Sequence, residues 1–206
     1  MEADALKSLI DWLDASMPVL GTLSGPIYSS VLRTNQAELL SEAKQTLLES
    51  HAKAAMFSVL GQQEELQKLS VALSDIGIPI IALKGSAYGS SLYGGGYPRT
   101  SCDIDILVKP SDYDRCRKFL ETIAEPLVDP LIPLQNAGML FEWGYRISGP
   151  VPRIVEVHSG LTHAQLFAID DNDLWEESRP HPELPNDTVR CLCPEHAVLH
   201  LAIHGF

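Results

Sequence analysis

Apolar residues recur at helical spacing in the N-terminal part of the chain. The pattern between residues 5 and 13 predicts a first helix, and the prolines and glycines between residues 18 and 26 are expected to end it. A longer helical pattern runs from about residue 35 to residue 75, with Thr34 as its N-cap and Gly77 and Pro79 beyond its end. Gly61 is a candidate point at which this pattern divides into two helices. Packing against the downstream domain is the favoured role for these helices.

From residue 78 the pattern changes to short apolar runs separated by Gly, Pro and Asp. Strands are predicted at residues 78–83, 103–108, 141–147 and 153–158. Helices are predicted at residues 86–93, from a cap at Ser111 or Asp112 to about residue 123, and at residues 162–168 and 194–204, with a flexible loop at residues 94–98. This order predicts an α/β (α+β) fold with a small mixed sheet flanked by helices. The expected domains are a helical N-terminal region (1–77), a sheet-containing core (78–160) and a helical C-terminal region (161–206).

Composition narrows the class of protein. The chain has 206 residues, of which 45% are hydrophobic and 20% charged, as in ordinary soluble domains. Its 27 acidic and 15 basic side chains give a net charge of −12, which disfavours binding to duplex nucleic acid. The acidic N-terminus argues against a secretory signal, and no apolar run is long enough for a membrane span. The four cysteines form no recognisable framework, so reduced thiols and a cytoplasmic location are expected.

Asp103 and Asp105 carry the strongest chemical signal. Because side chains alternate along a strand, both carboxylates project from one face while Ile104 and Ile106 take the other. A pair facing solvent at a strand edge is the structural alternative, but carboxylates inside an apolar run are costly without a partner. Two such carboxylates repel each other unless a cation lies between them, and hard oxygen ligands suit Mg²⁺ or Mn²⁺.

Lys84, Gly85 and Ser86 form a second signal, at the end of a predicted strand. Backbone N–H groups at the start of a helix bind anions, and glycine lets a phosphate approach closely. Such turns also contain Gly and Ser for geometry alone. Arg99 is a further candidate for contacting a triphosphate, with a loop-ordering surface role as the alternative.

Glu156 is a third carboxylate within a predicted strand, and His158 shares its face. A solvent-facing Glu is the simpler interpretation of this residue alone. If its strand neighbours the Asp103–Asp105 strand, three carboxylates converge as in two-metal phosphoryl or nucleotidyl transfer. His158 is a candidate to orient Glu156 or contact substrate, although a hydrogen-bonded core histidine is the favoured interpretation.

His196, His200 and His204 recur every four residues on one predicted helix. This spacing is compatible with a zinc site, but no other ligand is evident in the sequence. Packing or capping is therefore the favoured interpretation of these histidines.

Together, the stretches Leu83-Lys84-Gly85, 103–108 and Glu156-Val157-His158 resemble the nucleotidyltransferase superfamily with the polymerase-beta-like fold, in a poorly characterised bacterial branch. The resemblance covers about residues 78–160. It implies that Gly85 and Ser86 hold the nucleotide's phosphates, that Asp103 and Asp105 hold both metals, and that Glu156 completes the catalytic metal site and helps to deprotonate the acceptor. Two departures are a longer interval between Ser86 and Asp103 and a Glu where Asp is common.

The resemblance implies a metal-dependent enzyme that transfers a nucleoside monophosphate from an NTP to an acceptor and releases pyrophosphate. A small molecule, peptide or protein is the expected acceptor class, because the chain is acidic. Two alternatives are a glycosyltransferase that uses a sugar nucleotide and a non-catalytic nucleotide-binding module. Because a helical pattern continues to the last residues, the chain is also expected to be a fragment of a longer protein.

Overall fold

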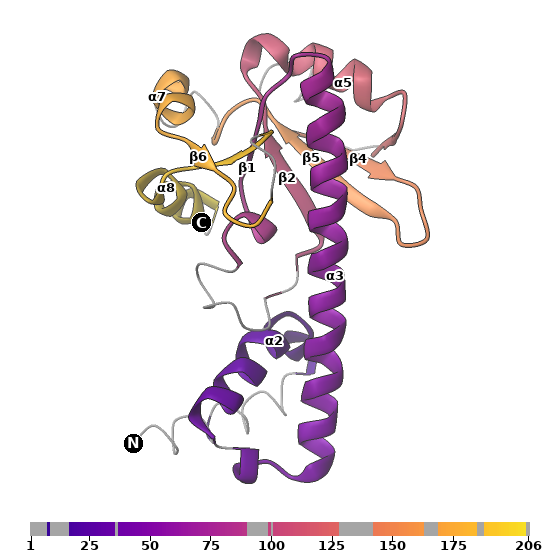
Figure 1. The fold of residues 1–206 in the computed structure, drawn as a ribbon, viewed down its shortest axis with the longest axis vertical. Coiled ribbons are helices and arrows are strands. Elements are labelled where there is room, and N and C mark those ends of the chain that lie inside the picture. The colour runs from indigo at the N-terminus through magenta and orange to yellow at the C-terminus, as the bar shows by residue number, and fades with distance from the viewer. Residues whose placement is uncertain are drawn as a thin grey trace. The chain divides into compact units, whose positions relative to one another are not determined.

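The computed structural model describes residues 8, 17–35, 37–89, 99, 101–127, 142–162, 169–184 and 188–204 (Figure 1). Its helices are α2 (Met17–Thr34), α3 (Glu42–Asp75), α5 (Tyr113–Leu120), α7 (Asp171–Glu176) and α8 (Pro194–His204). Three short 3₁₀ helices are η1 (Ala37–Leu39), η2 (Gly85–Ala87) and η3 (Pro110–Asp112). The strands are β1 (Ile80–Ala82), β2 (Asp103–Leu107), β3 (Glu125–Pro126), β4 (Glu142–Ile147), β5 (Arg153–His158), β6 (Arg179–Pro180) and β7 (Val189–Cys191).

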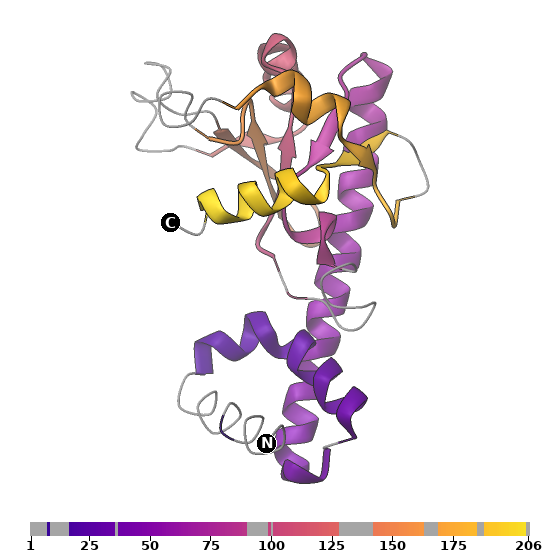
Figure 2. The same cartoon turned by 90° about the vertical axis from the view of Figure 1, so that its left-hand side faces the viewer.

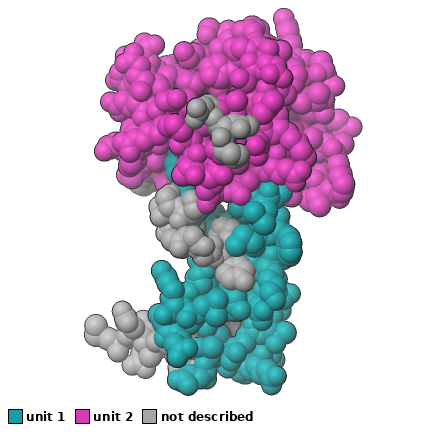
Figure 3. Space-filling view, viewed as in Figure 1, with its two compact units in different colours: residues 1–61, 88–101 teal, residues 62–87, 102–206 magenta. Residues whose placement is uncertain are grey.

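The chain divides into two compact units (Figure 3). The first comprises residues 1–61 and 88–101, and the second comprises residues 62–87 and 102–206. The three sequence-based domain ranges stay a prediction. Among the helices that the structure describes, none combines the length and apolar character that a membrane span requires. All four cysteines are free thiols, which agrees with the expected absence of a disulfide framework.

A mixed sheet of seven strands organises the second unit, which confirms the predicted fold class. The strand order is β3-β4-β5-β2-β1-β7-β6, and β2 pairs in parallel with β5. β1 is antiparallel to β2 and parallel to β7. The four strands expected from the sequence are β1, β2, β4 and β5. The strands β3, β6 and β7 were not predicted, because segments of two or three residues show no recognisable alternation of apolar and polar positions.

One face of this sheet is apolar and lies against helix α5. Ile104, Ile106, Val155 and Val157 are buried, as alternation along β2 and β5 requires. On the same face, the Arg117 guanidinium of α5 lies 3.8 Å from the centre of the Trp143 ring on β4. Helices α7 and α8 lie on the opposite side of the sheet from α5 (Figures 1 and 2). The acidic residues of β2 and β5 therefore project toward the α7–α8 side.

Three details of the N-terminal helices differ from the sequence prediction. Pro26 lies inside α2 rather than ending a helix, because Ile27 and Val31 are buried in a cluster with Leu40 and Leu48. Thr34 is the last residue of α2, where its hydroxyl donates to the Ser30 carbonyl at 2.8 Å, so it is not an N-cap.

Helix α3 continues through Gly61 without a division. The buried neighbours Val59 and Gln62 show that packing outweighs the cost of a helical glycine, about 1 kcal/mol. The predicted stop is confirmed, because Gly77 has a φ of +73° and the Ile78 N–H donates to the Leu73 carbonyl at 2.9 Å.

Other predictions concern the segments around the sheet. Within the helix predicted at 86–93, the 3₁₀ helix η2 ends at Ala87 and Gly89 is in an α-helical turn, and residues 90–93 lie outside the described part of the chain. Asp112 precedes α5 but makes no side-chain cap, because its carboxylate accepts from Arg115 instead. Helix α8 has the predicted bounds, and α7 was not predicted. The helices expected at 5–13 and 162–168 and the loop at 94–98 lie mainly outside the described residues.

Candidate functional site

The pairing of β2 with β5 brings two of the predicted carboxylates together. In this parallel pair, Asp105 is in register with Glu156, and Leu107 is in register with His158. Residues in register share a face, so Asp103, Asp105, Glu156 and His158 all belong to one side of the sheet. The condition set by the sequence, that the two acidic strands be neighbours, is therefore met.

Asp105 is the most constrained carboxylate of the group. Its side chain is buried, and its Oδ1 lies 2.9 Å from Lys84 Nζ and 3.0 Å from His158 Nε2. Its Oδ2 is also buried and accepts no hydrogen bond from an N–H or hydroxyl group of the residues that the structure describes. Burial alone would raise the pKa of Asp105, but the hydrogen bonds and charges of His158 and Lys84 lower this pKa to about 2. Asp105 is thus an anion at every physiological pH.

Glu156 has the opposite electrostatic character. Burial, followed by the charges of Asp105, Asp103 and Glu142 and a hydrogen bond with Asp105, raises the pKa of Glu156 to about 7. Without a cation, its carboxyl is therefore about half protonated near neutral pH. A carboxyl whose pKa is raised by neighbouring carboxylates marks a place where negative charge is concentrated.

His158 connects two acidic side chains. It is fully buried, and its Nε2 lies 3.0 Å from Asp105 Oδ1 while its Nδ1 lies 3.5 Å from Glu142 Oε2. The hydrogen-bonded core histidine favoured by the sequence is therefore present, and its nearest partner is Asp105. Metal-ligand atoms of Asp105, Glu156 and His158 all lie within 4.8 Å of one another. Glu142 was not singled out in the sequence, although its place on a strand predicted next to that of Glu156 was a usable signal.

Asp103 lies outside this close group of three. It is partly buried on the same face of β2, and its charge contributes to raising the pKa values of both Glu156 and Lys84. Its carboxylate is therefore near enough to act electrostatically on the group. Metal ligation by Asp103 stays a prediction.

The turn after β1 places Lys84 and Gly85 beside the carboxylates. Burial alone would lower the pKa of Lys84, but the charges of Asp105, Asp103 and Glu156 and a hydrogen bond with Asp105 raise this pKa above its ordinary value. Gly85 is exposed and has a φ of +53°, which side chains with a Cβ rarely adopt. The Ala87 N–H closes the turn by donating to the Lys84 carbonyl at 3.0 Å. The side chain of Ser86 is outside the described part of the chain.

Arg99 is exposed and belongs to the first compact unit. The predicted contact of Arg99 with a triphosphate is therefore untested and stays a prediction. Lys84 is the basic residue that the structure places directly at the carboxylates.

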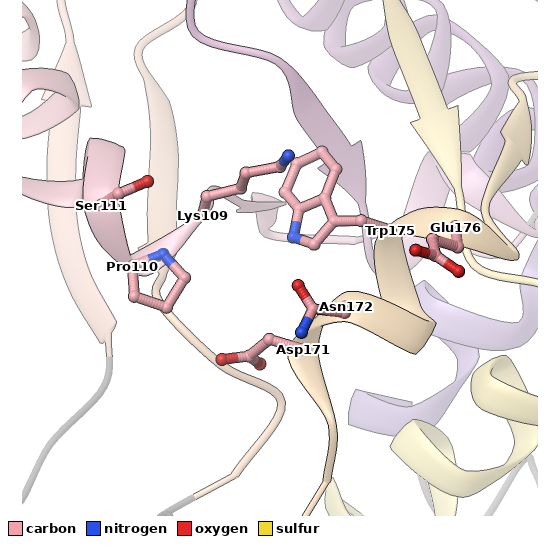
Figure 4. A pocket seen from close by; sticks show the side chains of 7 residues that line it. All are labelled: Lys109, Pro110, Ser111, Asp171, Asn172, Trp175 and Glu176. Atoms are coloured by element: carbon pink, nitrogen blue, oxygen red, sulfur yellow. The ribbon is translucent and has the colours of Figure 1, made fainter.

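A separate pocket of about 410 Å³ opens between the segment that follows β2 and helix α7 (Figure 4). The Lys109 ammonium lies 5.3 Å from the centre of the Trp175 ring. The pocket is lined by Lys109, Pro110, Ser111, Asp171, Asn172, Trp175 and Glu176. It contains none of the residues predicted to bind metal or nucleotide; Ser111 was noted only as a candidate helix cap.

The sheet with a glycine turn and paired strand carboxylates defines a protein of the nucleotidyltransferase class. Residues 20–206 match the model of a family described as an uncharacterised nucleotidyltransferase, and the chain belongs to this family. The match extends well beyond residues 78–160 and includes most of the N-terminal helical region. Comparisons with curated proteins and with solved structures found no match.

Gly85→Ala is expected to weaken NTP binding at least threefold. A Cβ at a φ of +53° costs about 1 kcal/mol in backbone strain, and it would also stand in the place predicted for a phosphate. Gly77→Ala is the matched control, because Gly77 has a φ of +73° at the end of α3 and is not in the turn. Titration calorimetry with Mg²⁺ and an NTP should show weakened binding for Gly85→Ala alone, while both variants lose a similar amount of stability. Equal NTP affinities of the two variants would remove Gly85 from the phosphate site.

Proposed function

We propose that this protein is a metal-dependent nucleotidyltransferase that moves a nucleoside monophosphate from an NTP to an acceptor and releases pyrophosphate. One observation carries the proposal: Asp105 and Glu156 are in register on neighbouring strands, on the face that also holds Asp103. The Lys84–Gly85 turn adjoins this face through the ion pair between Lys84 and Asp105. The family description supports the same class of reaction.

The donor set fits a hard divalent cation. Carboxylate oxygens are the ligands that Mg²⁺ and Mn²⁺ prefer, and the buried Asp105 Oδ2 accepts no hydrogen bond from an N–H or hydroxyl group of the described residues. The raised pKa of Glu156 reflects a concentration of negative charge that a cation would relieve. Asp103, Asp105 and Glu156 are the proposed ligands. When bound, the metal neutralises charge on the triphosphate and favours ionisation of the acceptor.

The chain's own groups have distinct proposed roles. His158 and Lys84 hold Asp105 Oδ1, which leaves Oδ2 directed to the ligand site. The Lys84 ammonium supplies positive charge close to the turn, and Gly85 lets the phosphates approach the backbone. Glu156 is also proposed to accept the proton of the acceptor. The acceptor oxygen or nitrogen then forms a bond to the α-phosphorus while the bond to the α–β bridging oxygen breaks and pyrophosphate leaves.

The proposal is tested by pyrophosphate release from the four common NTPs with Mg²⁺ or Mn²⁺, across a panel of amino acids, amino sugars, alcohols and peptides. Metal-dependent release that matches labelling of one acceptor class is the expected result. Binding of NTP and metal without turnover across the panel would favour the non-catalytic module. Thermal stabilisation by UDP-sugars, but not by NTPs, would favour the glycosyltransferase.

A further inference from the structure

A second group of metal-ligand side chains gathers where α7 ends and α8 begins. Glu177 directly follows α7, Cys193 directly precedes α8, and His196 lies in the first turn of α8. Glu177 Oε2 accepts from the Cys193 thiol at 3.6 Å and lies 3.8 Å from His196 Nε2. All three ligand atoms lie within 4.8 Å of one another. Cys193 is buried, whereas Glu177 is exposed.

The start of α8 explains why Cys193 and His196 meet. The Cys193 carbonyl accepts from the Ala197 N–H at 2.9 Å, which makes Cys193 the N-cap, and Pro194 occupies the first helical position. His196 is then the third helical residue. The side chains of an N-cap and of the third helical residue lie together, as they do in a capping box. The helix start therefore favours this pairing without any contribution from a ligand.

Two of the three distances within this group are near those of a tetrahedral zinc site. With zinc bonds of about 2.0 Å to oxygen and nitrogen and about 2.3 Å to sulfur, tetrahedral ligands lie roughly 3.3–3.6 Å apart. The observed separations of 3.6 Å for sulfur and oxygen and 3.8 Å for nitrogen and oxygen are close to these values. Only small side-chain movements are needed for the three groups to share one ion.

We propose that Glu177, Cys193 and His196 form a Zn²⁺ site that links the end of α7 to the start of α8. A thiolate and an imidazole are ligands that zinc favours and that Mg²⁺ does not, so this site differs in chemistry from the carboxylates of β2 and β5. On binding, the Cys193 thiol releases its proton to solvent and a zinc–sulfur bond forms, with no change of oxidation state. The inference does not depend on the proposed function.

Glu195 lies between Cys193 and His196 in the first turn of α8 and is a candidate fourth ligand. A water molecule can fill the same position, as in zinc sites with three protein ligands. His200, one helical turn further along α8, is not part of the close group. Of the three histidines spaced for a possible zinc site in the sequence, the proposed site uses His196. Its other ligands, Glu177 and Cys193, were not indicated by the histidine spacing.

The test is a Co²⁺ titration of the whole chain, stripped of metal and reduced with a phosphine. One equivalent is expected to bind with a thiolate-to-cobalt charge-transfer band and tetrahedral visible bands, and one equivalent of Zn²⁺ should displace it. Zn²⁺ should also raise the melting temperature. Cys193→Ser should abolish the charge-transfer band, and His196→Gln and Glu177→Gln should each weaken binding at least tenfold.

Two control variants make this result specific. Cys102→Ser removes an exposed thiol and Glu176→Gln removes a neighbouring acid; both should keep the thiolate-to-cobalt band of the parent. A spectrum without a thiolate band, or a band lost in Cys102→Ser and kept in Cys193→Ser, would overturn the proposal. If Cys193→Ser does not fold, parent-like binding by both His196→Gln and Glu177→Gln would overturn it instead.

Discussion

Asp105→Asn is expected to lower metal-dependent NTP turnover by about 10³-fold or more. The substitution keeps the size of the side chain but removes its charge, and it replaces one acceptor oxygen with a donor. Lys84 Nζ and His158 Nε2 then face a neutral group. The oxygen proposed to bind the metal becomes a weaker ligand or is replaced by the amide nitrogen. Pyrophosphate release under saturating NTP and Mg²⁺ measures the loss.

The fold should survive this change. Lys84 is partly exposed and can be rehydrated, so a fall of a few degrees in melting temperature is expected rather than unfolding. Asp114→Asn is the matched control, because Asp114 is exposed on α5, and it should retain full turnover. If Asp105→Asn keeps more than a tenth of the parent's turnover, Asp105 is not at the reacting centre.

Glu156→Gln is expected to change how stability depends on pH in metal-free buffer. The pKa of Glu156 is about 7 in the folded chain, above the ordinary value of 4.5. Between these values the folded state holds more protons than the unfolded state, so the parent loses stability as pH rises from about 4.5 to about 7. Glutamine does not titrate. Between pH 4.5 and pH 8, the free energy of unfolding of the variant should therefore rise relative to that of the parent by roughly 2 kcal/mol, after an allowance for solvent screening.

Urea unfolding at several pH values, with a chelator present, measures this difference. Glu125→Gln, an exposed acid on β3, should follow the parent at every pH. At pH 8, Mg²⁺ should stabilise the parent more than Glu156→Gln, because the cation relieves repulsion among the carboxylates. Parallel pH profiles for the parent and Glu156→Gln would show that Glu156 is not held among like charges.

The strands of the site were predictable because burial and alternation act together on them. The sequence 103–108 places two acids on one face and apolar residues on the other, and only a strand satisfies both. The neighbouring strand of Glu156 was recognisable for the same reason. Whether these two strands are neighbours depends on contacts between distant segments, so the sequence could only assume it. The structure shows that they pair.

Prediction from the local sequence was wrong where tertiary contacts outweigh helix propensity. Pro26 and Gly61 are helix breakers by propensity, yet both lie within helices whose apolar residues are buried. Strand β7 has only three residues, and its place is set by parallel pairing with β1. Glu177 and Cys193 are sixteen residues apart and meet only through the packing of α7 and α8. Long-range encounters of this kind leave no periodic signal in a single sequence.

The most direct test of the proposed centre is Mn²⁺ binding followed by electron paramagnetic resonance, with and without a non-hydrolysable NTP analogue. The parent is expected to bind Mn²⁺ more tightly when the analogue is present, because phosphate oxygens complete the coordination. Asp105→Asn should lose this enhancement, while His196→Gln should keep it. Equal Mn²⁺ binding by the parent and Asp105→Asn, unaffected by the nucleotide, would contradict the assignment of this face of the sheet as a metal-dependent nucleotidyl-transfer site.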